Sequence, residues 1–165
     1  MKYEELLSFA EQLPPGLNQF EDIGLILESE PSLWDYDSTP KNSVTFATTG
    51  GDGVHFNFLA IDGKWSEQSP VIMTVPMNFG EENLVIGDSL EDFLSLGIDY
   101  GYFGLEQLSY DKEGTIAKIE AIRESERSPE LNALKERFEL STWENVASRL
   151  EMLNQEHFEK FEIEE

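Results

Sequence analysis

Residues 44–61 read VTFATTGGDGVHFNFLAI, and this stretch decides the fold. On both sides of the glycine-rich segment at 50–53, apolar residues alternate with polar ones. A period of two residues is typical of strands with one apolar face. The glycines tolerate positive φ, so TGGDG predicts a tight hairpin between two strands.

Two further short connections follow this hairpin, at Asp62-Gly63 and at residues 78–82. They separate the apolar runs PVIMTVP and NLVIG, which have the length of strands. Parallel neighbours would need long crossovers, so three short connections predict an antiparallel meander. We therefore expect an α+β fold, an antiparallel sheet of four or five strands with helices packed mainly on one face.

The alternation assigns a face to each strand residue. The face expected under the helices consists of Val44, Phe46, Val54, Phe56, Phe58, Val71, Met73, Val75, Leu84 and Ile86. The other face consists of Thr45, Thr49, His55, Asn57, Ile72 and Thr74. This second face is mixed in polarity, so we expect it to be partly solvated.

Helical spacing and cap signals predict the remaining elements. Helices are expected at residues 2–13, 17–28, 89–97 and 105–110, and from Ser128 and Ser141 onward. Gly97 is expected to end its helix in the C′ position. Residues 29–43 read as a loop held by Trp34 and Tyr36, residues 111–124 fit helix or strand, and Phe158, Phe161 and Ile163 fit a closing strand or simple packing.

Composition limits the classes of protein. The chain has 165 residues, no cysteine, and a net charge of −23 from 34 acids and 11 bases. We expect a single domain over residues 1–165, located in the cytoplasm, because the N-terminus has acids where a signal peptide has an apolar run. A surface this acidic repels nucleic acid and anionic membranes and attracts basic partners; it also serves solubility.

No motif indicates catalysis. The TGGDG segment precedes a strand rather than a helix, so it lacks the helix N-terminus that cradles phosphate. Asp52 and His55 are too few ligands for a metal, and His55 is expected to be a hydrogen-bonded strand residue. We expect no enzyme, no cofactor, no catalytic residue and no metal site.

Three segments together resemble the SUKH superfamily. They are TFATTGGDGVHF, PVIMTVP and NLVIGDSLEDFLSLG, within a similarity that spans residues 40–110, and LEQLSYD and the C-terminal helices give weaker support. This superfamily includes fungal cell-wall-synthesis regulators of Smi/Knr type and bacterial proteins of immunity type. Many members approach the glycine turn from a Pro-led helix, whereas TPKNSVTFATTG reads as a strand here, so the subgroup stays open.

The resemblance implies an α+β fold, no catalytic residues and a binding role. In the bacterial branch that role is to neutralise a toxin, often a nuclease; in the fungal branch it is signalling or scaffolding. Nucleases that grip phosphates are basic, so the acidic composition favours an immunity protein. A regulatory scaffold is the alternative, and a metal-dependent hydrolase built on carboxylates is the remote one. The identity of the partner and the oligomeric state stay open.

The meander also predicts where a basic partner binds. Its first and third connections lie at the same end of the sheet, which brings Asp52 together with Phe79, Glu81 and Glu82. Acids that steer a basic protein and an aromatic ring that anchors it suit an interface. The rival site is the opposite end of the sheet, with Trp65, Glu67 and Asp88.

Overall fold

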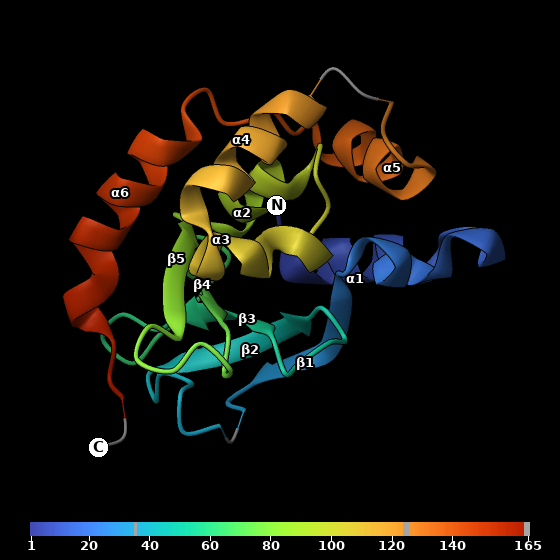
Figure 1. Cartoon of the computed structure of the whole chain (residues 1–165). Coiled ribbons are helices and arrows are strands. Elements are labelled where there is room, and N and C mark those ends of the chain that lie inside the picture. The colour runs from blue at the N-terminus through green and yellow to red at the C-terminus, as the bar shows by residue number, and fades with distance from the viewer. Residues whose placement is uncertain (35, 124–125, 164–165) are drawn as a thin grey trace.

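The computed structural model describes residues 1–34, 36–123 and 126–163, with the backbone alone at Asn18. Five strands form one sheet, in which every neighbouring pair is antiparallel and the order follows the sequence (Figure 1). The strands are β1 (Ile26–Ser32), β2 (Ser43–Thr48), β3 (His55–Leu59), β4 (Val71–Thr74) and β5 (Asn83–Gly87). The predicted α+β fold with an antiparallel meander is confirmed.

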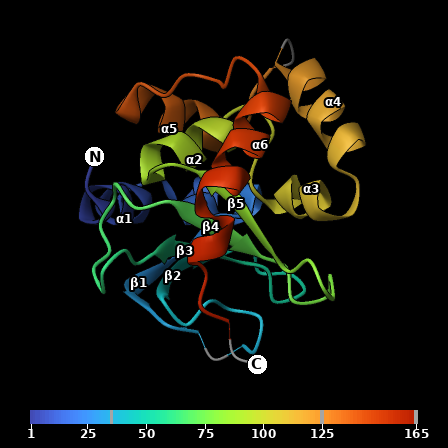
Figure 2. The ribbon, with the colours of Figure 1, turned by 90° about the vertical axis from the view of Figure 1, so that its left-hand side faces the viewer.

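The helices gather on one side of this sheet, and α6 runs along the β5 edge (Figures 1 and 2). The α-helices are α1 (Tyr3–Glu11), α2 (Leu90–Gly97), α3 (Gln107–Tyr110), α4 (Lys112–Ile122), α5 (Pro129–Phe138) and α6 (Val146–His157). Three 3-10 helices join them: η1 (Pro15–Ile23), η2 (Phe103–Glu106) and η3 (Phe158–Lys160). Among the described residues, no helix is both long and apolar enough to cross a bilayer.

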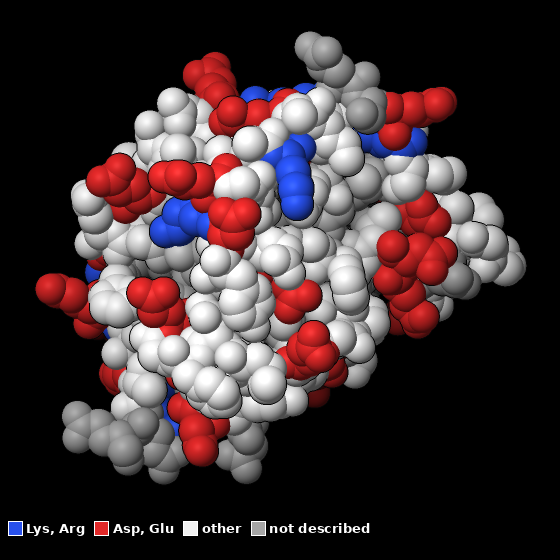
Figure 3. Space-filling view, viewed as in Figure 1, with Lys and Arg blue, Asp and Glu red and all other residues white. Residues whose placement is uncertain are grey.

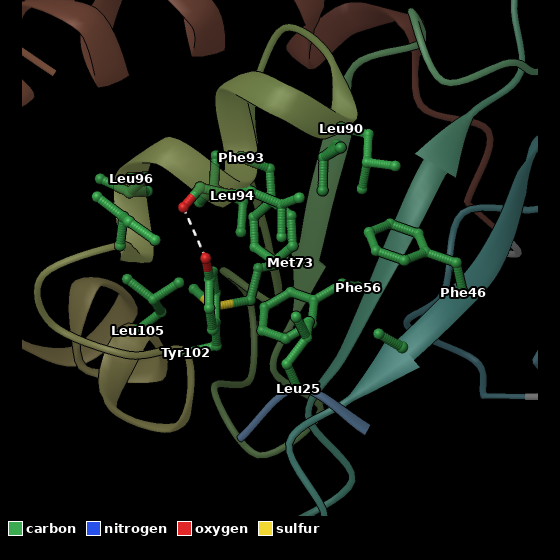
Figure 4. Packing of buried hydrophobic residues seen from close by; sticks show 14 of the residues in the cluster. Leu25, Phe46, Phe56, Met73, Leu90, Phe93, Leu94, Leu96, Tyr102 and Leu105 are labelled. Atoms are coloured by element: carbon green, nitrogen blue, oxygen red, sulfur yellow. Dashed lines mark hydrogen bonds between the residues drawn. The ribbon is translucent and has the colours of Figure 1, made fainter. Parts of the chain in front are cut away.

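The core lies between the apolar face of the sheet and α2 (Figure 4). Phe93 of α2 packs on Phe56 of β3 with ring centroids 4.8 Å apart, and the Tyr102 hydroxyl donates to the Leu94 carbonyl oxygen at 2.6 Å. Ser89 caps α2 by accepting from the Asp92 N–H. The C′ role predicted for Gly97 is wrong.

Gly97 is the last helical residue of α2, and Ile98 is the C-cap. Its missing side chain serves close packing, because a Cβ there would lie 2.3 Å from the ring of Tyr102. A glycine near the end of a predicted helix can have either of two causes. Either it adopts a left-handed conformation at the terminus, or it allows another side chain to approach closely, and the sequence looks the same in both cases.

Three other element predictions differ from the structure, and one segment left open between helix and strand is now assigned. The helix predicted at 17–28 ends at Ile23, because Gly24 adopts φ +73° and the chain then enters β1, which occupies the first part of the predicted 29–43 loop. The helix predicted from Ser141 begins at Val146, capped by the Asn145 side chain. The open 111–124 segment holds α4, whose N-terminus is capped by Asp111.

The second face of the sheet is buried rather than partly solvated, so that prediction is wrong. Thr45, His55, Asn57, Ile72 and Thr74 are all fully buried. Trp34 and Tyr36 cover part of this face, because their rings each stack on His55 at 5.1 Å. The predicted packing role of these two aromatic residues is confirmed.

The C-terminal segment is tied to the start of β2. The Lys41 N–H donates to the Glu162 carbonyl oxygen at 2.6 Å, and Asn42 donates to the Lys160 carbonyl oxygen at 2.8 Å. Phe158 opens η3 and Phe161 packs partly buried against the core, so the segment adds no strand within the described residues.

A row of hydrogen-bonded polar side chains crosses the buried second face. Thr45 donates to Asn57 at 2.6 Å, and the Asn57 amide donates to the Thr74 hydroxyl at 2.9 Å. Thr74 in turn donates to Asn83 at 2.6 Å, and Asn83 donates to the Ser38 carbonyl oxygen at 2.8 Å. These bonds offset the cost of burying polar groups, which is about 1–3 kcal/mol for each unpaired group.

Candidate functional site

The strand registers confirm which connections share an end of the sheet. His55 pairs with Thr48 on one side and Thr74 on the other, and Thr74 pairs with Asn83. Thr48, His55, Thr74 and Asn83 thus lie side by side at one end of the sheet. The β2–β3 connection (residues 49–54) and the β4–β5 connection (residues 75–82) both lie beyond this end. Asp52, Phe79, Glu81 and Glu82 therefore share an end, as predicted.

The hairpin tip presents Asp52. Asp52 has φ +51° between Gly51 and Gly53, and its side chain is exposed. Asp tolerates this left-handed conformation better than most residues with a Cβ. A Cβ added to Gly51 would lie 3.2 Å from the ring of Phe103, so the hairpin tip packs against η2.

The β4–β5 connection presents Phe79. Its side chain is 82% exposed, the largest exposure among the exposed large hydrophobic residues that the structure describes. The loop around it is held in place: the Asn78 amide donates to the Glu81 and Ser109 carbonyl oxygens at 2.9 and 3.2 Å. An exposed ring on a fixed loop loses little conformational entropy on binding.

Residues 103–110 join the two connections into one surface. Phe103 contacts the hairpin tip at Gly51, and Ser109 bonds the β4–β5 connection at Asn78. We name this area the loop-end surface; it consists of Asp52, Met77, Phe79, Glu81, Glu82, Phe103, Glu106 and Tyr110. In Figure 3 the lower front of the molecule, where the β4–β5 connection runs in Figure 1, is an uncharged area bordered by acidic side chains.

The acids of the loop-end surface lack basic partners. No Lys or Arg occurs between Lys64 and Lys112 in the sequence. Within the described part of the chain, none of the four acids of this surface forms an ion pair. Burial, and then the negative charge of Asp52, raises the pKa of Glu106. This end of the sheet therefore carries uncompensated negative charge.

Sequence reasoning missed half of this surface. Met77, Phe103, Glu106 and Tyr110 were not among the predicted site residues, although Met77 and Phe103 are 59% and 55% exposed. Phe103 stands in GYFGLEQLSY, where helical spacing makes Leu105 and Leu108 the buried residues and turns Phe103 and Glu106 outward. The helical spacing could have indicated that Phe103 and Glu106 face outward. The contact between Phe103 and the hairpin tip could not be deduced from the sequence.

At the opposite end of the sheet, two of the three rival residues have structural roles. The Trp65 ring stacks on Phe58 with centroids 5.2 Å apart and planes 6° from parallel, which leaves Trp65 37% exposed. Glu67 accepts from the Tyr3 N–H at 2.9 Å and thus caps α1. Burial opposes the ionised form of Glu67, but hydrogen bonds from the backbone N–H groups of Tyr3 and Glu67 itself, together with Lys2, lower its pKa.

The third rival residue, Asp88, lies in a cluster with Glu156 and His157, whose ligand-type atoms are all within 4.8 Å of one another. The sequence did not predict this cluster. Lys160 Nζ lies 3.2 Å from His157 Nδ1, and an ammonium group only donates, so Nδ1 accepts and Nε2 carries the proton toward Asp88 at 3.3 Å. A metal at Nε2 would need the lone pair of that nitrogen, and in the neutral ring the proton would then sit on Nδ1, facing the Lys160 ammonium group. The contacts therefore fit a hydrogen-bonded helix terminus better than a metal site.

His55 has both ring nitrogens in hydrogen bonds, as predicted. Nδ1 lies 2.7 Å from the Gly53 carbonyl oxygen and Nε2 lies 2.8 Å from Thr39 Oγ1. Burial lowers the pKa of His55, which favours the neutral ring. His55 therefore supports the base of the hairpin, and Asp52 stands apart from it at the exposed tip.

Comparison with family models, curated proteins and solved structures finds no match to this chain.

Proposed function

We propose that this protein is a non-catalytic, cytoplasmic binding protein that neutralises a basic toxin, with a nuclease as the favoured class of target. The observation that carries the proposal is Phe79, an aromatic side chain 82% exposed on a hydrogen-bonded loop, beside acids that form no ion pair within the residues the structure describes. A ring of this kind can enter a pocket of the partner while the acids attract its positive charge. The resemblance to immunity-type SUKH proteins points in the same direction.

The acids supply the attraction at long range. Glu81 is exposed beside Phe79, and Glu82 is half-buried and accepts from the Gly80 N–H at 3.0 Å. Both side chains stand on the same short connection as the ring, so a basic surface drawn toward them meets Phe79. Such steering raises association rates at low salt and is screened over about 10 Å at 0.1 M ionic strength.

The experiment measures binding to the basic domain of a toxin encoded beside this protein's gene. Reversing Glu81 and Glu82 to lysine is expected to slow association several-fold at low salt and hardly at high salt. Phe79→Ala is expected to speed dissociation by about tenfold or more. This corresponds to a loss of about 1.4 kcal/mol or more of binding free energy, as expected when an aromatic anchor is removed. Met152→Ala is the matched control, because Met152 is half-exposed on α6, away from the loop-end surface.

Protection of cells that express the toxin domain gives a second readout, and Phe79→Ala should weaken it. If neither set of changes alters a rate while Trp65→Ala abolishes binding, the partner binds the opposite end of the sheet. If the encoded neighbour is basic and toxic but does not bind, the immunity function is rejected.

A regulatory scaffold of Smi/Knr type is the second candidate, favoured by the same resemblance. Its binding would depend weakly on salt, because scaffold interfaces need no steering by net charge. The remote hydrolase alternative is tested by adding Zn²⁺, Mg²⁺ or Ca²⁺ in modest excess. Stabilisation above about 2 kcal/mol would mean tight metal binding to the folded state and would favour the hydrolase.

A further inference from the structure

A groove runs between α4 and α6 and opens beside the loop-end surface. Two adjoining hollows share Lys112, Glu113, Asn154 and Phe158, and together they extend from Gly80 and Glu81 to Ala147. The apolar lining comes from Ile116 on α4, from Ala147 and Leu150 on α6, and from Phe158, which is 61% exposed. Figures 1 and 2 show α4 and α6 on either side of this region.

The groove is closed to strand addition at its floor. Asn154 of α6 donates to the Val85 carbonyl oxygen at 2.9 Å and accepts from the Val85 N–H at 2.8 Å. Its amide therefore occupies the donor and the acceptor that Val85, in the middle of β5, would offer to an added strand. An occupant must bind through side chains instead, as a helix does in a groove between two helices.

The rim of the groove is acidic. Glu113, Glu151 and Glu159 are exposed along it, and none of the three pairs with a Lys or Arg in the described residues. Lys112 is the one basic residue among those that line the two hollows. Acidic side chains are visible on the surface over both helices (Figure 3). A segment that places lysines or arginines opposite these glutamates complements the rim.

We propose that this groove binds a basic amphipathic helix of the protein partner. Apolar residues spaced by three and four positions would lie on Ile116, Ala147 and Phe158, while basic residues face the glutamates. On the α6 side the lining runs from Ala147 to Phe158, a length of about 16 Å that fits about three helical turns, and α4 lines the groove through Lys112, Glu113 and Ile116 near its N-terminus. The inference rests on the proposed basic partner; the groove shares Glu81 and Tyr110 with the loop-end surface, whereas Phe79 does not line it.

The test uses a synthetic, fluorescently labelled Lys/Leu peptide of about four helical turns with leucines at helical spacing. A scrambled peptide of the same composition has equal charge and no apolar face. We expect the amphipathic peptide to bind at least tenfold more tightly than the scrambled one. The double change Glu113→Lys and Glu151→Lys should weaken its binding roughly tenfold. Ala147→Arg should weaken it at least as much, because it adds bulk and positive charge to the apolar lining.

The matched control is Glu5→Lys with Glu136→Lys. Glu5 is exposed in the first turn of α1, as Glu113 is in α4, and Glu136 is exposed within α5, as Glu151 is within α6. The control changes the net charge equally and should alter peptide binding less than twofold. Phe79→Ala should leave peptide binding unchanged, because Phe79 does not line the groove.

Equal binding of the two peptides would reject the proposal, because net charge alone would then explain binding. Equal loss in the groove variants and in the control would reject it for the same reason. If the groove variants lose peptide binding and Phe79→Ala weakens the toxin complex, both the groove proposal and the proposed role of the loop-end surface are supported. If the groove variants bind the peptide normally, the groove proposal fails whatever the toxin assay gives.

Discussion

Both ends of the sheet carry aromatic and acidic residues, but these side chains contact the rest of the fold at one end and face solvent at the other. At the opposite end, the Trp65 ring stacks on Phe58 and Glu67 caps α1. At the loop end, Phe79 projects into solvent and the nearby acids have no basic partner within the described residues. The sequence offered an aromatic residue with acids at each end, three at the loop end and two at the opposite end. What separates the ends is whether the folded chain already uses those side chains.

The largest contrast is expected on removing the two aromatic rings. Trp65→Ala should lower the free energy of unfolding by about 2 kcal/mol, because the stacked ring covers Phe58 and is only 37% exposed. Phe79→Ala should change it by less than about 0.5 kcal/mol, as for a solvated surface residue. Urea denaturation of both variants measures the difference. Equal losses would mean that Phe79 also supports the fold.

A smaller effect is expected at the hairpin tip that presents Asp52. Gly53 has φ +73°, and a Cβ there would lie 3.1 Å from the Tyr36 hydroxyl oxygen. Gly53→Ala should therefore destabilise the fold by about 1–2 kcal/mol.

Gly16→Ala is the control for the hairpin tip, because Gly16 has no atom within 4 Å of an added Cβ and lies outside the positive-φ set. That change should be neutral or slightly stabilising, since alanine restricts the unfolded chain. Thermal unfolding distinguishes the two variants. A Gly53 variant as stable as Gly16→Ala would contradict the strain assigned to the tip.

The acid at the opposite end should stabilise the protein at neutral pH. The pKa of Glu67 is lowered, so its contribution is present above the ordinary pKa of a glutamate and is lost as the pH falls through the folded-state pKa. Glu67→Gln should cost less than about 1 kcal/mol at pH 7, and the difference from the parent should vanish in acid. Denaturation at several pH values checks this, and a constant difference would assign the loss to packing.

The smallest effect is expected at Glu106, with the opposite sign. Its pKa is raised, so the stability linked to its protonated form is present below the ordinary pKa and is lost as the pH rises through the folded-state pKa. Glu106→Gln should therefore stabilise the protein at pH 7 by a few tenths of a kcal/mol and have no effect in acid. The same pH series measures it. Destabilisation at pH 7 would show that the loop-end surface is not under like-charge repulsion.

The order of β2 to β5 was predictable because turns and alternation are local signals, whereas β1 lies in residues predicted as helix and loop. Gly50, Asp52 and Gly53 in the first hairpin, and Asp62 and Gly63 in the second turn, adopt positive φ, as turns rich in glycine indicate. The meander follows from the short connections. The ends of the sheet followed from the same topology. The sequence alone could thus group Asp52, Phe79, Glu81 and Glu82 at one end of the sheet.

The parts that failed depend on contacts between distant segments. The second face looked half-solvated because the sequence of residues 33–42 does not say which surface it covers, and Trp34 and Tyr36 meet His55 only in three dimensions. Phe103 and Glu106 joined the loop-end surface for the same reason, through the hairpin tip. Glu67 looked like a free acid because its partner, the Tyr3 N–H, is 64 residues away.

The row of polar side chains across the sheet has a consequence for how the strands find their alignment. A strand displaced by two residues keeps the same face toward the helices, so burial of apolar groups does not distinguish this error from the native pairing. In the native pairing Asn57 lies opposite Thr45 and bonds both Thr45 and Thr74. A shift of two would place His55 or Leu59 there and leave the Thr45 hydroxyl without Asn57 as its acceptor. The buried amides and hydroxyls thus encode position along the strands, whereas the phenylalanines encode only the face.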